Sequence, residues 1–205
     1  MTTIVTLNSA RARLAKHDFG SEGTAYWPIS DLHQSNEDEW INEAIREMPH
    51  EGFARSIWAH HPNLKEATQK LAAYIGPRWP ARDGGALLSL CIQEACIRWQ
   101  TSVQNGEAFL GRVVGVYLYG LTEHAADVAR LTITGVDETG ATHRWTHFSE
   151  PLKGWATRLR IDTVCAEFAS PAPSEVVIAG IRTHMITHLS SPVDTGYLIK
   201  HAANG

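Results

Sequence analysis

Cysteine is scarce in this chain. Three cysteines among 205 residues cannot form a complete set of disulfides. Two of them, Cys91 and Cys96, are five residues apart, so on a helix they would point in different directions and suit neither a bridge nor a shared metal ion. We therefore expect reduced, mostly buried thiols in a reducing compartment.

Long hydrophobic runs are also missing. Residues 1–20 contain no apolar core of the kind found in a signal peptide, and the acidic segment that follows argues against a transit peptide. The most apolar stretch, residues 85–103, is too short and too interrupted by polar residues for a membrane span. We expect a soluble protein made in the cytoplasm, with no membrane partner.

An excess of positive charge is absent as well. The formal net charge is -4, which gives no general attraction to nucleic acid, so a nucleic-acid partner is not expected. The chain is 43% hydrophobic and 20% charged, values that are ordinary for a globular protein and exclude wholesale disorder.

The chain also lacks the common local catalytic motifs. The chain has no P-loop, no dinucleotide-binding glycine fingerprint, no Gly-x-Ser-x-Gly elbow, no His-Glu-x-x-His and no Cys-x-x-Cys. Common phosphate, dinucleotide, serine-hydrolase and zinc-protease chemistries therefore have no local support. We expect no cofactor, no metal and no catalytic residue.

The first half of the chain has the periodicity of helices. Residues 85–103 are apolar nearly all round, which predicts a buried central helix. Amphipathic helices are predicted before it at residues 36–48, 52–60 and 63–75, with Asn36 as N-cap and Glu39 placed for a capping box. A short strand or arm at residues 4–7 and a short helix to residue 16 precede them. This pattern predicts a helical domain over residues 1–105.

After residue 105 the hydrophobic periodicity becomes two. Strands are predicted at residues 109–119, 128–134, 142–148, 157–163 and 175–187, with a turn at 136–140 and Gly180 as a bulge. The predicted fold class is α+β: an N-terminal helical bundle followed by an antiparallel, jelly-roll-like β-sandwich over residues 106–205. No flexible linker separates the two halves, so a shared core is compatible with this pattern.

Three segments of the second half, VVGVYLYG, ARLTITGVDETG and TRLRID, resemble the jelly-roll sandwiches of galactose-binding-like domains. The resemblance covers less than half of the chain. It implies a carbohydrate- or protein-binding module and transfers no binding residue.

Histidine is abundant, with eleven residues. His143 and His147 share one face of a predicted strand, and His184 and His188 share one face of another, so neighbouring strands could bind a metal together with Asp162. Residues four apart on a strand are roughly 13 Å apart, however, so each strand could supply one ligand at most. We favour scattered surface or interface histidines over a metal-dependent enzyme.

Arginines on predicted strands favour a protein interface over a nucleic-acid surface. Tryptophans near turns can either stack on sugar rings or anchor a protein interface, and the sequence does not separate these two uses. Trp40, Trp58 and Trp99 fall on apolar helix faces and are predicted to be core residues instead. Arg112 shares the predicted arginine-bearing sheet face. The candidate interface residues are Trp27, Trp79, Arg130, Arg144, Trp145, Trp155, Arg158, Arg160 and Tyr197.

These observations favour a non-enzymatic structural subunit of a ring, tube or shell, such as a bacteriophage head–tail connector, tail or capsid-associated protein. Its expected partners are copies of itself and other assembly proteins, and its expected location is the virion. The C-terminal residues after Ser190 are predicted to form an extended arm that reaches a neighbouring subunit. The alternatives are the carbohydrate- or protein-binding module and, less favoured, the metal-dependent enzyme.

Overall fold

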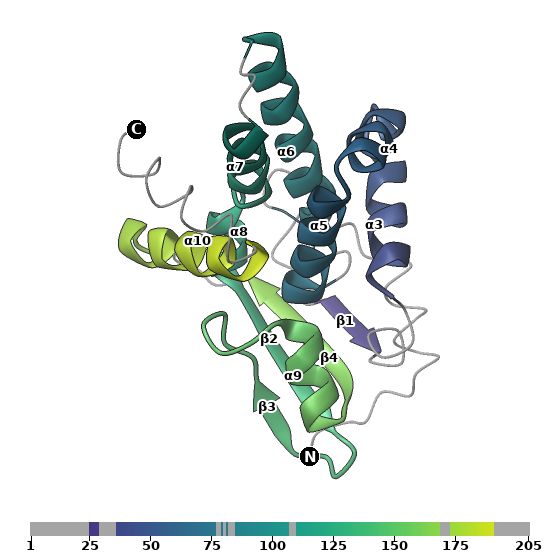
Figure 1. Ribbon diagram of the computed structural model, residues 1–205. Helices are drawn as coiled ribbons and strands as arrows, with labels where there is room; N and C mark the ends of the chain where they lie inside the picture. The colour runs from purple at the N-terminus through teal and green to yellow at the C-terminus, as the bar shows by residue number, and fades with distance from the viewer. Residues whose placement is uncertain are drawn as a thin grey trace.

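The structure is a computed structural model that describes residues 25–28, 36–76, 79, 81, 85–106, 110–168 and 173–190. It is an α+β protein in which a group of helices lies at one end of an antiparallel sheet (Figure 1). The arm and helix expected before residue 25, and the arm expected after Ser190, lie outside the described residues.

The helices of the first half lie close to their predicted positions. They are α3 (Glu37–Arg46), α4 (Glu51–His60), α5 (Pro62–Ile75) and α6 (Leu87–Gln104). Asn36 caps α3 as expected, because its side chain accepts a 2.9 Å hydrogen bond from the backbone N–H of Glu39. The central helix α6 buries Leu88, Cys91 and Ile92, among others.

Helix α7 (Leu110–Leu121) packs closely against α6, and α8 (Ala125–Arg130) follows it. Gly120 makes this approach possible, since a Cβ placed there would lie 2.5 Å from the Cα of Ala95. The two backbones therefore touch at a point where any side chain on α7 would collide with α6.

The sheet is antiparallel, with strand order β1-β4-β2-β3. Its strands are β1 (Ala25–Pro28), β2 (Leu131–Asp137), β3 (Thr142–Arg144) and β4 (Ile161–Phe168). The turn between β2 and β3 lies where the sequence predicts one. Asp137 organises this turn: one carboxylate oxygen accepts from the backbone N–H groups of Thr139 and Ala141, each at 2.9 Å.

Helix α9 (Leu152–Leu159) covers one face of the sheet (Figure 1). Trp155 of α9 and Ile161 of β4 meet over Gly135 of β2, where a Cβ would lie 2.8 Å from the indole ring and 2.5 Å from Ile161. Gly135 thus leaves room for the Trp155 indole against the sheet, and Trp155 is only 3% exposed.

Two of the predicted strands are wrong. Residues 109–119 were expected to be a strand, yet 110–119 belong to α7, and residues 175–187 belong to α10 (Glu175–Leu189). The first segment is rich in valine and aromatic residues and the second in valine and isoleucine, and these residue types favour strands locally. Burial against α6 in one case and against α5 and α8 in the other outweighs that preference.

The predicted strand at 157–163 is also only partly correct, because α9 continues to Leu159 and β4 begins at Ile161. A β-sandwich needs two packed sheets, and the residues described here form a single sheet covered by helices. The α+β class is therefore correct, and the jelly-roll-like sandwich is not the architecture of this part of the chain.

One hydrophobic cluster runs through both halves, from Trp40 of α3 to Leu189 of α10. Leu131, Ile133 and Val164 of the sheet belong to the same cluster as the helices of the first half. The division at residue 105 stays a prediction about domains, and the core is continuous across it. Among the helices described, none is both long and apolar enough to cross a bilayer.

Candidate functional site

The most exposed apolar side chains of the second half lie on one strip of α10. We call this the α10 strip: Val176, Val177, Gly180 and His184 of α10, together with Phe148. The four helix residues share a face because positions three and four apart on a helix are neighbours. Phe148 extends the strip, since its Cζ would lie 3.7 Å from a Cβ on Gly180 and its ring is 5.8 Å from that of His184.

This strip is open to solvent to an unusual degree. Val176 is 81% exposed, Phe148 is 55% exposed and Val177 is 42% exposed. The opposite face of α10, with Ile181, Met185 and Leu189, is buried in the core. The two exposed valines thus lie in the first turn of a helix whose other face is buried.

Beneath the strip, α10 rests on a cluster of aromatic and imidazole rings. Tyr74 of α5 lies at its centre and is 1% exposed. The Tyr74 ring lies 5.8 Å from His184, 5.5 Å from His188 and 5.9 Å from Trp145, measured between ring centroids. The Tyr74 hydroxyl donates to the backbone carbonyl of His147. These contacts join α10, α5 and the segment after β3.

His147 completes this cluster, with its ring 4.7 Å from that of Trp145. Its Nε2 is buried without a hydrogen-bond partner in the described structure. Burial lowers the pKa of His147 below its ordinary value, and the backbone carbonyls of Val128 and Leu131 offset part of that effect. Neither carbonyl accepts a hydrogen bond from Nε2.

A second cluster holds the other side of α10. Arg182 stacks on the Tyr119 ring, with its Cζ 5.1 Å from the ring centroid, and donates to the Tyr119 hydroxyl at 3.0 Å. Arg98 of α6 lies on the same ring at 5.3 Å, and its Nη2 is 3.1 Å from Glu123 Oε2, an ion pair without hydrogen-bond geometry. Arg182 thereby ties α10 to the end of α7.

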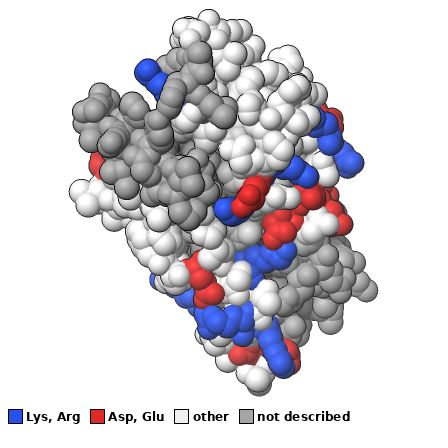
Figure 2. Space-filling view, viewed as in Figure 1, with Lys and Arg blue, Asp and Glu red and all other residues white. Residues whose placement is uncertain are grey.

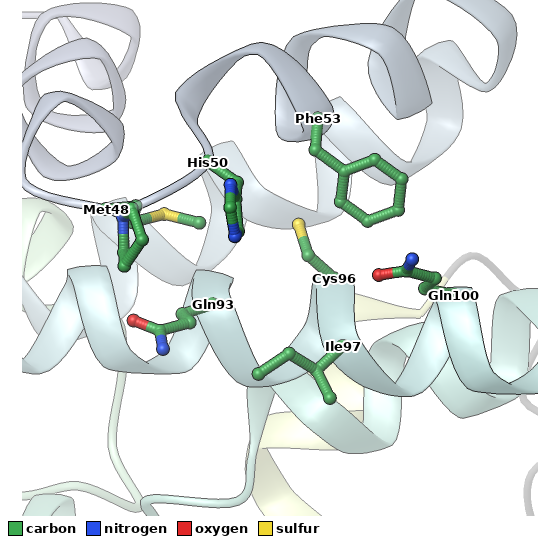
Figure 3. Close-up of a pocket in the computed structure, with 8 residues that line it drawn as sticks. Met48, His50, Phe53, Gln93, Cys96, Ile97 and Gln100 are labelled. Carbon is green, nitrogen blue, oxygen red and sulfur yellow. The ribbon is translucent and has the colours of Figure 1, made fainter.

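A separate apolar hollow lies between α4 and α6 (Figure 3). Phe53, Cys96 and Ile97 line it together with Met48, Pro49, His50, Gln93 and Gln100. Its volume is about 60 Å³, far below the roughly 300–1,000 Å³ of sites for drug-sized ligands. Burial raises the pKa of the Cys96 thiol to about 12, which keeps it protonated and unreactive at neutral pH.

Three of the four tryptophans predicted to lie at an interface are core residues. Trp79 is 1% exposed, Trp145 is 2% exposed and Trp155 is 3% exposed, so none can contact a partner in this conformation. Trp145 Nε1 donates to the carbonyl of Glu150 at 2.8 Å, and Trp79 Nε1 donates to that of Ile75. Backbone carbonyls inside the protein thus accept hydrogen bonds from the indole N–H groups of tryptophans that the sequence places near turns.

The remaining aromatic candidates are Trp27 and Tyr197. Trp27 lies in β1, where its backbone is opposite Val164 of β4, and its side chain is outside the description. Tyr197 lies outside the described residues.

The predicted arginine-bearing sheet face does not form. Arg112 lies on α7, Arg130 ends α8 and Arg144 lies on β3, where it reaches Thr132 Oγ1 at 3.4 Å. Arg158 pairs with Glu150, and Arg160 lies 3.6 Å from Glu138. On the face shown in Figure 2, basic and acidic groups lie beside one another, so that face carries no patch of one sign.

The histidines gather differently from the predicted pattern. His143 lies on β3 and pairs with Asp137 at 2.8 Å, while His184 and His188 are one helical turn apart on α10. In the part of the chain that the structure describes, no group of three or more histidine, cysteine or acidic side chains could hold a metal ion.

The structure does not support the resemblance to galactose-binding-like domains, because two of the resembling segments lie wholly or partly on helices. The segment VVGVYLYG lies within α7, and TRLRID spans the end of α9 and the start of β4. A scan against protein-family models and a search of the curated proteins both find no match for this chain.

Sequence reasoning missed the residues that form the α10 strip. Val176, Val177 and Phe148 were placed on predicted strands, where alternation would bury half of them. The signal that could have indicated a helix here is the spacing of Ile181, Met185 and Leu189, which lie four residues apart and therefore on one helical face.

Proposed function

We propose that this protein is a structural assembly subunit that associates with copies of itself through the α10 strip. The observation that carries the proposal is the exposure of Val176, at 81%, on a helix already anchored in the core, and of Phe148, at 55%, beside Gly180 of the same helix. Leaving two large apolar side chains in water is unfavourable, and contiguous apolar strips are typical of protein interfaces.

The strip suits a second copy of the same chain better than a small ligand. It is convex, because it lies on the outside of a helix, whereas small-molecule sites are concave. A symmetric pair of α10 helices would bury valine against valine or phenylalanine, as in a two-fold interface where the same patch meets itself. Arg182 and the Tyr74 cluster hold α10 in place from below, so the strip is presented on a fixed support.

The proposal extends to a more specific class of assembly protein. Within the class of assembly subunits we propose a bacteriophage virion component, such as a head–tail connector, tail or capsid-associated subunit. The support is the direct junction of a helical part with a sheet and the outward apolar helix. Detection of the chain in purified particles by mass spectrometry would test it.

The self-association is tested by measuring mass in solution with light scattering. The native chain, of 22.6 kDa, is expected to give a multiple of that mass. The substitution Val176→Glu places a charge in the strip and is expected to give the monomer mass. Val176 and the control position Val103 are both exposed, so circular dichroism should show that a glutamate variant at either position folds.

The matched control is Val103→Glu, which makes the same change at a 45% exposed valine on α6. It is expected to leave the mass unchanged. A native protein that is monomeric at all concentrations would contradict the proposal. An oligomer that Val103→Glu disrupts and Val176→Glu spares would place the interface on α6 instead.

A further inference from the structure

The end of α6 carries a chemically labile pair of residues. Asn105 is directly followed by Gly106, and both residues are exposed. Asparagine is one of the thermolabile residue types, because its side-chain amide can react with the backbone nitrogen of the next residue. A glycine in that next position has no side chain to shield its nitrogen, and its backbone rotates more freely than that of any other residue. The Asn105 amide therefore has a nucleophile beside it that is easily reached.

Asn105 lies where the helix stops constraining the backbone. It is the C-cap of α6, with φ -76° and ψ 5°, and its N–H donates to the Thr101 carbonyl at 3.0 Å. Gly106 follows with φ +77°, the left-handed conformation that commonly ends a helix. The Gly106 N–H donates to the Val103 carbonyl at 3.0 Å. This hydrogen bond must open before Asn105 can rotate about ψ, and helix ends fray readily.

The space around Gly106 allows that rotation. Apart from its chain neighbours, a Cβ placed on Gly106 would meet nothing within 4 Å. At Gly120 of α7, by contrast, a Cβ would lie 2.5 Å from the backbone of Ala95. The end of α6 can therefore rearrange without displacing the core, and the Gly106 nitrogen can approach the side-chain Cγ of Asn105.

The other asparagines that the structure describes are placed differently, and none precedes a glycine. Asn36 caps α3, where its side-chain oxygen accepts from the backbone N–H of Glu39 at 2.9 Å. Asn42 lies inside α3, and Asn63 lies in the first turn of α5. Regular helical backbone holds the residues after Asn42 and Asn63, so these asparagines serve as comparisons within the same molecule.

We propose that Asn105 is a site of spontaneous deamidation. The Gly106 nitrogen loses its proton to hydroxide and attacks Cγ of Asn105, and the tetrahedral centre that results expels the side-chain nitrogen as ammonia. A five-membered succinimide remains, and one water molecule opens it at either of its two carbonyl carbons. The products are aspartate and isoaspartate at position 105, so one amide and one water give one carboxylic acid and one ammonia.

The reaction changes both the charge and the backbone at the end of α6. It lowers the formal net charge from -4 by one unit, because a neutral amide becomes a carboxylate. A negative charge at this end of a helix is unfavourable, since it faces the negative end of the helix dipole. In isoaspartate the main chain also passes through Cβ. That product is the substrate of carboxyl methyltransferases that repair isoaspartate, so an enzyme of this class is the partner that the site fits.

This inference does not involve the α10 strip, so its outcome is independent of the proposed self-association. Peptide mapping of the full chain, aged at neutral pH, tests it, with electron-transfer fragmentation to distinguish isoaspartate from aspartate. Conversion at Asn105 is expected to exceed that at Asn36, Asn42 and Asn63 by at least about tenfold, because a glycine follows only the first of these four. Equal conversion at the four sites, or none at Asn105, would overturn the proposal.

Ageing the chain in urea separates the effect of the fold from that of the sequence. The unfolded chain has no hydrogen bond from Gly106 to Val103 to open, so it is expected to react faster. The folded chain is expected to remain within about tenfold of that rate, because fraying helix ends open at almost no expense of free energy. An Asn105 that stays intact in the folded protein after the unfolded chain has reacted would contradict the proposal.

Asn105→Gln supplies the chemical control. Its amide carbon lies one bond further from the Gly106 nitrogen, so ring closure is slower, and an exposed neutral side chain leaves the fold intact. Methylation of the aged protein by a purified isoaspartyl methyltransferase is expected to be lost. Asn63→Gln, the same change at another exposed position, is expected to keep it. All proteins compared carry Asn204→Gln, because Asn204 also precedes a glycine. Full methylation of the Asn105→Gln protein would refute the assignment.

Discussion

Tyr117 is fully buried, yet its hydroxyl joins three helices. Trp58 Nε1 of α4 donates to it at 3.0 Å, and Thr68 Oγ1 of α5 lies at the same distance. Burial raises the pKa of Tyr117, so the hydroxyl stays protonated at any ordinary pH. The sequence predicts Trp58 as a core residue, and the structure adds the internal acceptor that satisfies its indole nitrogen.

Replacing this hydroxyl is expected to be costly. Tyr117→Phe leaves the buried Trp58 N–H without an acceptor, so we predict a loss of about 1–3 kcal/mol in the free energy of unfolding. Chemical denaturation followed by circular dichroism measures it. Tyr119→Phe is the control: its hydroxyl binds Arg182, which is partly solvent-exposed and can bind water instead, so a loss below about 1 kcal/mol is expected. Equal losses in the two variants would argue against the network.

At the scale of elements, the junction of α6 and α7 depends on Gly120. The sequence predicts α6 from its apolar composition, but it predicts a strand for α7, because valine, tyrosine and leucine dominate residues 110–121. The helix forms because its backbone can approach Ala95 closely, a contact that no local pattern contains. The same explanation applies to α10, whose apolar residues meet α5 and α8.

This contact gives a prediction with a matched control. Gly120→Ala would place its Cβ 2.5 Å from Ala95 Cα, where backbone atoms cannot give way, so we expect a loss of about 1–3 kcal/mol in stability. Gly52→Ala on α4 meets nothing within 4 Å and is expected to add up to about 1 kcal/mol through helix propensity. Thermal unfolding of both variants checks the pair, and a neutral Gly120→Ala would show that the helices can separate at this point.

At the scale of the whole molecule, the continuous core determines how the chain should unfold. Aromatic and aliphatic residues from α3 to α10 belong to one hydrophobic cluster, which includes both sheet and helix residues. Elements that share a core lose their stability together.

We therefore predict a single unfolding transition in denaturant. Tryptophan fluorescence, which reports on Trp58 in the first half and Trp155 in the second, and circular dichroism are expected to give the same midpoint. Two separate midpoints would indicate two independent domains divided near residue 105.

Local patterns in the chain are sufficient to predict the features that depend on neighbouring residues. The Asn36 cap, the central helix over residues 87–104 and the turn at Asp137 all follow from local spacing and side-chain chemistry. The α+β class follows as well, because helical and alternating patterns are both present.

The packing of distant segments against one another accounts for the remaining features. It made helices of residues 110–121 and 175–189, buried Trp145 and Trp155, and left Val176 and Phe148 exposed. The physical reason is that apolar, β-branched segments satisfy their backbone hydrogen bonds equally well in a strand or a helix, so the surfaces that they meet choose between the two.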